Sequence, residues 1–154
     1  MALDFRVLST LETEDAIRFA DARLRSAIAD DSERMLAGWA VPWRRESLAH
    51  YLPLGWSFAA RAGEGAERGR IEGFFLGQLF LFMRGQTQTL WIEHLESGPG
   101  EVTAALVELA VRTAREKHLQ RTIFVDQAHV RPHLATFGAE RIGDGLWEVR
   151  TTKG

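Results

Sequence analysis

Cysteine is absent from this sequence of 154 residues. Without it the chain has no thiol nucleophile, no disulfide and no cysteine-based metal site. An excess of charge of one sign is also missing, because 19 Lys and Arg residues face 21 Asp and Glu residues. The basic residues form no stripe along the sequence, so we expect no nucleic-acid partner.

Long hydrophobic segments are missing as well. The most apolar run, Phe74–Met83, is too short to span a bilayer and contains Gln78. The N-terminus carries Asp4 and Arg6 among its apolar residues, which is not typical of a signal peptide. We therefore expect a soluble, cytoplasmic protein with no membrane partner. The length and the ordinary globular composition predict a single domain over residues 1–154.

What the sequence does contain is a clear succession of strand and helix patterns. Apolar residues with a period of two predict strands, and those with a period near 3.6 predict helices. The expected strands are Leu3–Leu8, Trp56–Arg61, Arg70–Met83, Gln88–Leu95, Thr122–Val125 and Leu146–Thr152. The expected helices are one from Thr13 to near Asp30, two short ones within Asp31–Tyr51 (with Pro42 in the first turn of the second), one that follows the loop Ser97–Thr103 to near His118, and one over His129–Phe137.

This order predicts an α/β (α+β) fold with a mixed, mostly antiparallel central sheet, one parallel βαβ crossover and helices on both faces. The strand Arg70–Met83 has apolar residues on both faces, so we expect both faces to be covered. Gly73 and Gly77 lie on one face of it, where a bulge or a closely packed helix would need a residue without a side chain.

The segment TLWIEHLESGPGEVTAALVELAVRTAREKHLQRTIFV, residues 89–125, has the pattern of strand, glycine-containing turn, amphipathic helix and strand. With the opening FRVLSTLETEDAIRFA and the closing HVRPHLATFGAERIGDGLWEV, it resembles the GNAT superfamily of acyl-CoA-dependent N-acetyltransferases. The resemblance implies acetyl-CoA or another acyl-CoA as cofactor, with its pantetheine arm in the gap where the two parallel strands separate. It also implies that the acceptor is a small-molecule or protein amine.

The resemblance further implies a cofactor-binding turn. The family's pyrophosphate loop is Arg/Gln-x-x-Gly-x-Gly/Ala, whose glycines let backbone N–H groups approach phosphate. Here Glu101 and Thr103 take the two glycine positions, Gly98 takes the Arg or Gln position, and Pro99 supplies no N–H. The residues expected around the cofactor are Leu95, Ser97, Gly98, Gly100, Glu101, Val102, Thr103 and Asp126. Glu101 is equally explained as a favourable acid in the first turn of a helix.

Glu93 and His129 are the candidate catalytic residues. The family's general base is often a Glu on the cofactor strand, where Glu93 stands; a carboxylate beside Trp91 would have a raised pKa that suits an ammonium substrate. A simple pairing of Glu93 with an arginine is the alternative. His94 points to the other face of the sheet unless a bulge intervenes. His129 takes the place of a family Asn, to orient the ligand or donate a proton, or else it caps a helix.

Aromatic residues gather in the first half of the chain. They cover the edge of the core or line a substrate cleft, for which the candidates are Trp39, Trp43, Tyr51 and Trp91. Tyr51 is the only tyrosine, far in sequence from the helix that carries the family's usual acid. His129 and His133 are four residues apart, but two histidines are too few for a metal site, and we expect none.

Two functions follow from these observations. The first is transfer of an acetyl or acyl group to an amine of unknown identity. The alternative is a catalytically inactive GNAT-like module that binds a ligand or a protein, because the pyrophosphate loop departs from the family pattern. A homodimer formed through the Phe-rich antiparallel strands or the final strand is a further hypothesis that excludes neither function.

Overall fold

The computed structural model describes residues 2–82 and 87–151. Seven strands in these residues form one sheet in the order β1-β2-β3-β4-β5-β7-β6. They are β1 (Leu3–Val7), β2 (Phe58–Ala62), β3 (Ile71–Phe82), β4 (Thr87–Ser97), β5 (Arg121–Val125), β6 (Glu140–Arg141) and β7 (Leu146–Arg150). Only β4 and β5 pair in parallel among these strands. The expected mixed sheet with one parallel crossover is therefore confirmed.

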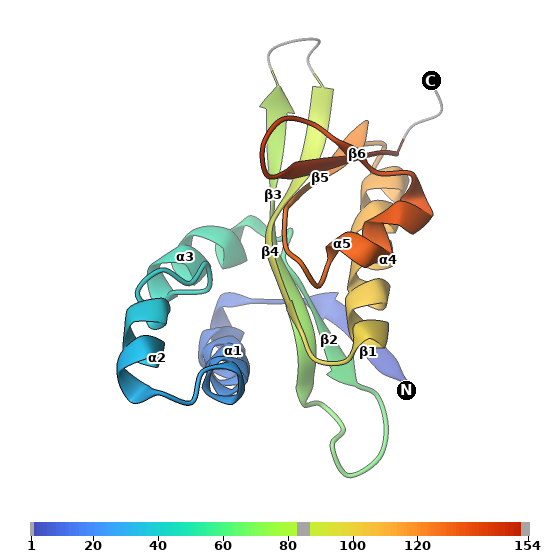
Figure 1. Ribbon diagram of the computed structural model, residues 1–154. Helices are drawn as coiled ribbons and strands as arrows, with labels where there is room; N and C mark the ends of the chain where they lie inside the picture. The colour runs from blue at the N-terminus through green and yellow to red at the C-terminus, as the bar shows by residue number, and fades with distance from the viewer. Residues whose placement is uncertain (1, 83–86, 152–154) are drawn as a thin grey trace.

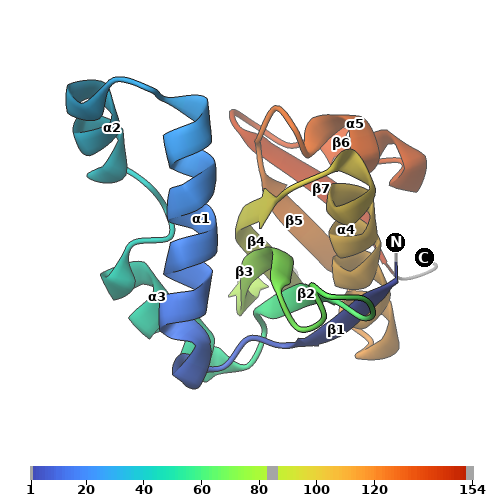
Figure 2. The ribbon, with the colours of Figure 1, turned by 90° about the horizontal axis from the view of Figure 1, so that it is seen from below.

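Helices lie on both faces of the sheet (Figures 1 and 2). On one face are α1 (Thr13–Ala27), α2 (Asp31–Gly38) and α3 (Arg45–Tyr51); on the other are α4 (Gly100–Glu116) and α5 (Arg131–Leu134). Short 3-10 turns are at Thr10–Glu12, Leu52–Leu54 and Ala135–Phe137. Each face has its own apolar core, because α4 packs on one side of β3 and β4 and α1 with α3 packs on the other. No helix within residues 2–82 and 87–151 has the length and apolarity needed to cross a bilayer.

Several element boundaries differ from those expected. The first helix ends at Ala27, because the backbone of Ile28 is extended. Asp30 then caps α2 by accepting the Glu33 N–H at 2.8 Å. Pro42 precedes α3 and is not in its first turn. The two-residue strand β6 is too short to have an alternating pattern. The expected strand ends at Met83 and Thr152 lie outside the described residues.

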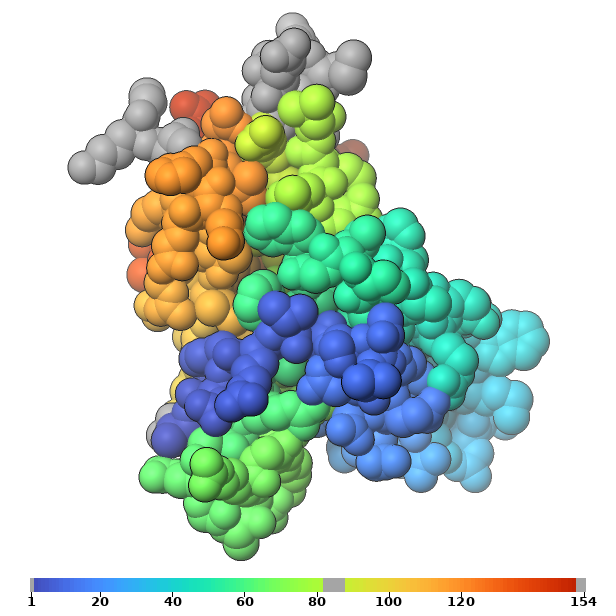
Figure 3. Space-filling model, turned by 180° about the vertical axis from the view of Figure 1, so that it is seen from behind, coloured from blue at the N-terminus to red at the C-terminus, as the bar shows by residue number. Residues whose placement is uncertain are grey.

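The strand β3 is buried along its first half only. Phe74, Phe75 and Leu76 have no exposed surface, whereas Leu79 and Leu81 are 43% and 58% exposed. The expectation that both faces are covered is wrong for this outer half, because β3 and β4 project past the helices on both faces of the sheet (Figure 1). At the opposite end of the sheet, residues 63–70 between β2 and β3 protrude from the body of the molecule (Figure 3).

Close packing explains both glycines of β3. A Cβ on Gly73 would lie 2.8 Å from Leu106 Cδ1 and 3.0 Å from Val102 Cγ1, both on α4. A Cβ on Gly77 would lie 2.4 Å from the carbonyl oxygen of Trp56. The expectation that these positions need glycine is confirmed, and Gly77 marks the place where the functional region begins.

Candidate functional site

A β-bulge in β4 organises the candidate site. Leu76 of β3 pairs with His94, but the next residue, Gly77, pairs with Ile92. Glu93 is therefore an extra residue in β4 without a partner position in β3, and such a bulge turns consecutive side chains toward one face. Glu93 and His94 thus share the face covered by α1 and α3, which decides the question that the sequence left open for His94.

Glu93 is held by two aromatic residues. Its Oε2 accepts a hydrogen bond from the indole N–H of Trp91 at 2.7 Å. Tyr51, at the end of α3, lies against the same carboxylate: burial, followed by the charge of Glu93 and a hydrogen bond to it, raises the pKa of Tyr51 to about 12. Tyr51 is therefore protonated at neutral pH, and its hydroxyl donates a hydrogen bond to Glu93. Folding brings this tyrosine to a carboxylate that lies 42 positions further along the chain.

The four aromatic residues expected in one cleft separate into two pairs. Tyr51 and Trp91 meet at Glu93. Trp39 and Trp43 instead line a different cavity of about 610 Å³ between α1 and α2, where Trp39 is 74% exposed. Within the described residues the four side chains therefore do not line one common cavity, and a role of either pair in binding substrate stays a prediction.

A second ionic cluster on the same face was not predicted. The Nε2 of His94 lies 2.7 Å from Glu96 Oε2, and Arg23 of α1 donates from Nε to Glu96 Oε1 at 2.8 Å. Burial by itself raises the pKa of Glu96, but the bonds from His94 and Arg23 outweigh it and hold that pKa below its usual value. Glu96 is therefore a carboxylate that orients the His94 ring. Alternation along β4 places His94 and Glu96 together, but nothing in the sequence indicates Arg23.

The parallel strands part beside this cluster. Their pairing runs from Thr89–Arg121 to Ile92–Phe124, after which β4 continues to Ser97 while β5 ends at Val125. The backbone of Leu95 faces the resulting gap. It is contacted by two side chains that follow β5, Gln127 and His129.

His129 lies where the sequence placed it, at the end of the parallel pair. Its Nε2 donates to the carbonyl oxygen of Leu95 at 3.0 Å. Burial lowers the pKa of His129, although the bond to the Leu95 carbonyl acts in the opposite direction. As the donor in this bond, the ring carries a proton on Nε2. Whether it acts on a ligand stays a prediction.

The turn from β4 to α4 offers few free N–H groups. The N–H of Gly98 donates to the Glu72 carbonyl at 3.1 Å, and Pro99 has none. The N–H groups of Val102 and Thr103 donate back to the Pro99 carbonyl at 2.9 and 3.3 Å.

Two N–H groups at the start of α4, those of Gly100 and Glu101, have no preceding helical carbonyl to bind. The Glu101 side chain is exposed beside them. The Thr103 hydroxyl bonds to the buried Ser97 hydroxyl at 2.6 Å, which gives Thr103 a structural role at the expected second glycine position.

Asp126, another expected cofactor residue, anchors the turn after β5. Its carboxylate accepts two bonds from Arg131, at 3.0 and 2.7 Å, and one from the indole N–H of Trp147 at 2.9 Å. The bonds from Arg131 and then Trp147 lower the pKa of Asp126 to about 2.

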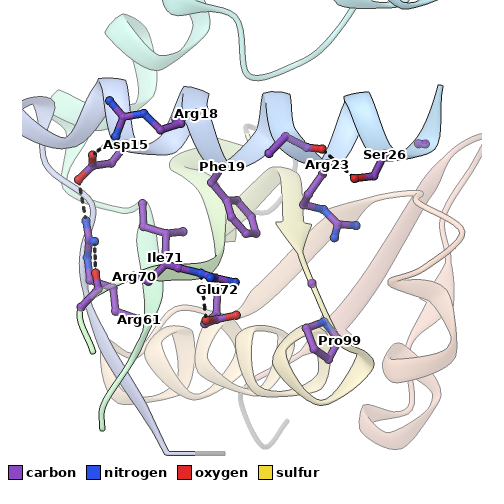
Figure 4. A pocket seen from close by; sticks show the side chains of 14 residues that line it. Asp15, Arg18, Phe19, Arg23, Ser26, Arg61, Arg70, Ile71, Glu72 and Pro99 are labelled. Carbon is purple, nitrogen blue, oxygen red and sulfur yellow. Dashed lines mark hydrogen bonds and ion pairs between the residues drawn. The ribbon is translucent and has the colours of Figure 1, made fainter. Parts of the chain in front are cut away.

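A cavity of about 1010 Å³ lies between α1 and the end of the sheet (Figure 4). Phe19 and Arg23 of α1 form one wall, Ile71 and Glu72 of β3 another, and Pro99 of the turn closes one end. Sequence patterns did not indicate it, because its walls are remote in sequence. In the ranges 2–82 and 87–151 there is no cluster of three or more His, Asp or Glu residues that could hold a metal ion.

No protein-family model matches the sequence, and no curated protein does. Solved structures do match. An agmatine N-acetyltransferase is 12% identical with a TM-score of 0.69, over 97% of this chain and 100% of that one. The PaiA N-acetyltransferase of Thermoplasma acidophilum, solved with coenzyme A, is 13% identical with a TM-score of 0.65, over 97% and 99%. The chain has the GNAT fold.

The polyamine N-acetyltransferase of Drosophila melanogaster has the same fold, at 13% identity and a TM-score of 0.65, over 92% of this chain and 85% of that one. The expected fold is therefore confirmed over nearly the whole chain. Identity this low shows the fold alone, and a fold does not determine a function. The chemistry has to be inferred from this chain's own residues and their geometry.

Proposed function

We propose that this chain is an acyl-CoA-dependent N-acyltransferase that acts on an amine. The observation that carries the proposal is the bulge at Glu93, next to the point where β4 leaves β5. It places two proton acceptors, Glu93 and His94, on one face beside a gap between parallel strands. Solved structures with the same fold include amine N-acetyltransferases, and this supports the same general kind of activity.

The chain fits an acyl-CoA in part. The Leu95 backbone is a donor and acceptor pair suited to the amides of a pantetheine arm, and the N–H groups of Gly100 and Glu101 are suited to phosphate oxygens. The carboxylate of Glu101 opposes the same phosphates. When bound, the cofactor would supply a thioester carbonyl that an amine can attack.

The chain's own side chains would prepare the amine. An alkylamine is protonated at neutral pH, so it must lose a proton before it can attack a carbonyl carbon. Glu93, oriented by Trp91 and Tyr51, would attract the ammonium group and accept that proton. His94, held by Glu96, is a second acceptor on the same face.

The cavity beside α1 is the proposed place for the body of the acceptor. Its volume is within the range of small-molecule sites, and Arg23 connects it to the Glu96–His94 pair. Its apolar lining, Phe19 and Ile71, lies between charged side chains (Figure 4). Since more arginines than acids line the cavity, the body of the acceptor that would match these walls is apolar or anionic, with its amine directed toward Glu93.

Calorimetric titration with acetyl-CoA and CoA tests the proposal, followed by release of free CoA with agmatine, spermidine and arylalkylamines. We expect binding and turnover in the wild type, and in Glu93→Gln binding with turnover slower by about a hundredfold or more. Glu108→Gln is the matched control, because Glu108 is an exposed residue of α4 paired only with Arg112 in the described part of the chain. If millimolar acetyl-CoA does not bind, the proposal fails.

The inactive GNAT-like module is the second candidate, and the turn before α4 favours it. The Gly98 N–H is used by Glu72, Pro99 has none, and Glu101 adds a negative charge. Glu101→Gly separates the two candidates without disturbing the bond between Thr103 and Ser97. If this change creates CoA binding that the parent lacks, the module is supported; tight binding by the parent would contradict it.

A homodimer is proposed to form through the outer half of β3, where Leu79, Phe80 and Leu81 are exposed. Sedimentation velocity over a hundredfold range of concentration tests this arrangement. Leu81→Lys should then shift the protein to monomer, whereas a wild type that sediments as a monomer throughout would exclude the dimer.

A further inference from the structure

The gap between β4 and β5 is bridged by a side chain amide of the chain itself. Gln127 Oε1 accepts the N–H of Leu95 at 2.8 Å, and Gln127 Nε2 donates to the Leu95 carbonyl at 3.1 Å. One carboxamide thus pairs with both backbone groups of one residue, as a neighbouring strand would. Leu95 is completely buried, so these groups depend on partners inside the protein.

The hydrogen-bonding capacity of Leu95 is fully used. Its carbonyl oxygen has two lone pairs, and Gln127 and His129 donate to them at 3.1 and 3.0 Å. Its single N–H is taken by Gln127. A ligand amide that enters the gap can therefore bind Leu95 only after Gln127 has left.

The backbone of Gln127 is fixed while its side chain can rotate. Its carbonyl accepts the N–H groups of Val130 and Arg131, both at 3.0 Å, and so opens the α5 turn. Asp126, just before it, is held by Arg131 and Trp147. Release of the carboxamide from Leu95 needs only a change of side-chain rotamer.

We propose that Gln127 is a latch that occupies the amide-binding edge of Leu95 and competes with the pantetheine arm of an acyl-CoA for it. The proposal rests on the proposed acyltransferase function for the identity of the ligand. The contact itself rests on the two bonds between Gln127 and Leu95. Binding then replaces the amide of Gln127 with an amide of the ligand, so Gln127 lowers the affinity for the pantetheine arm.

Gln127→Ala tests the latch with two measurements. The first is hydrogen exchange of the Leu95 amide by NMR in the unliganded protein, which we expect to be at least about tenfold faster, because one net hydrogen bond contributes about that factor. The second is calorimetric titration with D-pantetheine and with CoA. We expect both dissociation constants to fall by about tenfold, because no internal amide has to be displaced.

Two further variants sharpen the test. Gln127→Glu keeps the size of the side chain and still accepts the Leu95 N–H, but it cannot donate to the carbonyl. It should keep the amide protected and lower the dissociation constants less than Gln127→Ala does. Gln120→Ala is the matched control, because Gln120 Oε1 accepts the Gln88 N–H at 2.6 Å at the opposite end of the same strand pair.

The outcomes are distinct. Equal exchange of the Leu95 amide in Gln127→Ala and Gln120→Ala would overturn the contact. Equal or weaker ligand binding by Gln127→Ala, with binding measurable in the wild type, would overturn the competition. If neither protein binds pantetheine or CoA at millimolar concentration, the acyl-CoA function fails and the competition fails with it, while the exchange rates still report on the contact.

Discussion

Gly77→Ala is the substitution that most directly tests the geometry around the bulge. The new Cβ would lie 2.4 Å from the Trp56 carbonyl oxygen, whereas close carbon–oxygen contacts are about 3.3 Å or more. The opposing atom belongs to the backbone, so the chain itself has to move by roughly 0.9 Å. Overpacking of this kind costs about 1–3 kcal/mol, and a backbone partner places Gly77→Ala at the upper end.

We therefore expect the free energy of unfolding to fall by about 3 kcal/mol, which lowers Tm by roughly 6–12 °C for a chain of this length. Gly73→Ala should cost less, because its closest contact is the movable end of Leu106 at 2.8 Å. Gly98→Ala is the control: its nearest neighbour is 3.7 Å away, so the change should stay within about 0.5 kcal/mol.

Urea unfolding followed by circular dichroism gives the three values under one set of conditions. We expect the loss in the free energy of unfolding to be largest for Gly77→Ala, smaller for Gly73→Ala and smallest for Gly98→Ala. If Gly77→Ala unfolds at the same urea concentration as Gly98→Ala, the close approach of Trp56 to β3 is wrong.

Three other predictions concern the charged residues. Glu93→Gln should lower kcat by about 10²–10⁴, the usual contribution of a general base, with little change in the KM for acetyl-CoA in steady-state assays. Arg23→Met and Glu96→Gln should show a coupling free energy of about 1 kcal/mol in a double-mutant cycle of urea unfolding, and additivity would contradict their ion pair. The pKa of Asp126 falls from 3.8 to about 2 on folding, so its contribution to stability is complete above pH 4 and disappears as pH falls toward 2. Thermal melts of Asp126→Asn should accordingly lack part of the wild-type loss of Tm between pH 4 and pH 2.

The fold was predictable because its determinants are local and periodic. The alternation in β3 and β4, the apolar face of α4 and the short β-branched run of β5 each fix an element, and a strand–helix–strand unit then requires a parallel crossover. The predicted boundaries failed where a single residue decides them, as at Ile28, whose extended backbone ends α1, and at Asp30, whose side chain caps α2. The prediction that the outer half of β3 is buried failed because the sequence pattern shows which faces of a strand are apolar, but not how far the covering helices extend.

The site was predictable only where it belongs to one strand. Glu93 was identified from its position on β4, but its partner Tyr51 comes from another element. Arg23 contacts Glu96 across 73 positions, and no pattern within α1 distinguishes it from the other arginines of that helix. Gln127 is a polar residue after a strand, a place where sequence patterns indicate only a loop.

The gap explains why a residue such as Gln127 is needed at all. When β5 ends and β4 continues, one edge of β4 loses its partner while it is still buried, and a buried N–H or carbonyl without a partner costs about 1–3 kcal/mol. Solvent cannot reach Leu95, so a ligand or a side chain has to satisfy it. In the unliganded protein Gln127 satisfies it. The same two hydrogen bonds therefore stabilise the fold and define the binding edge. The net affinity for an acyl-CoA would therefore have to come from contacts other than those with Leu95. The turn before α4 is a weak source of such contacts, because Glu101 stands beside its two free N–H groups.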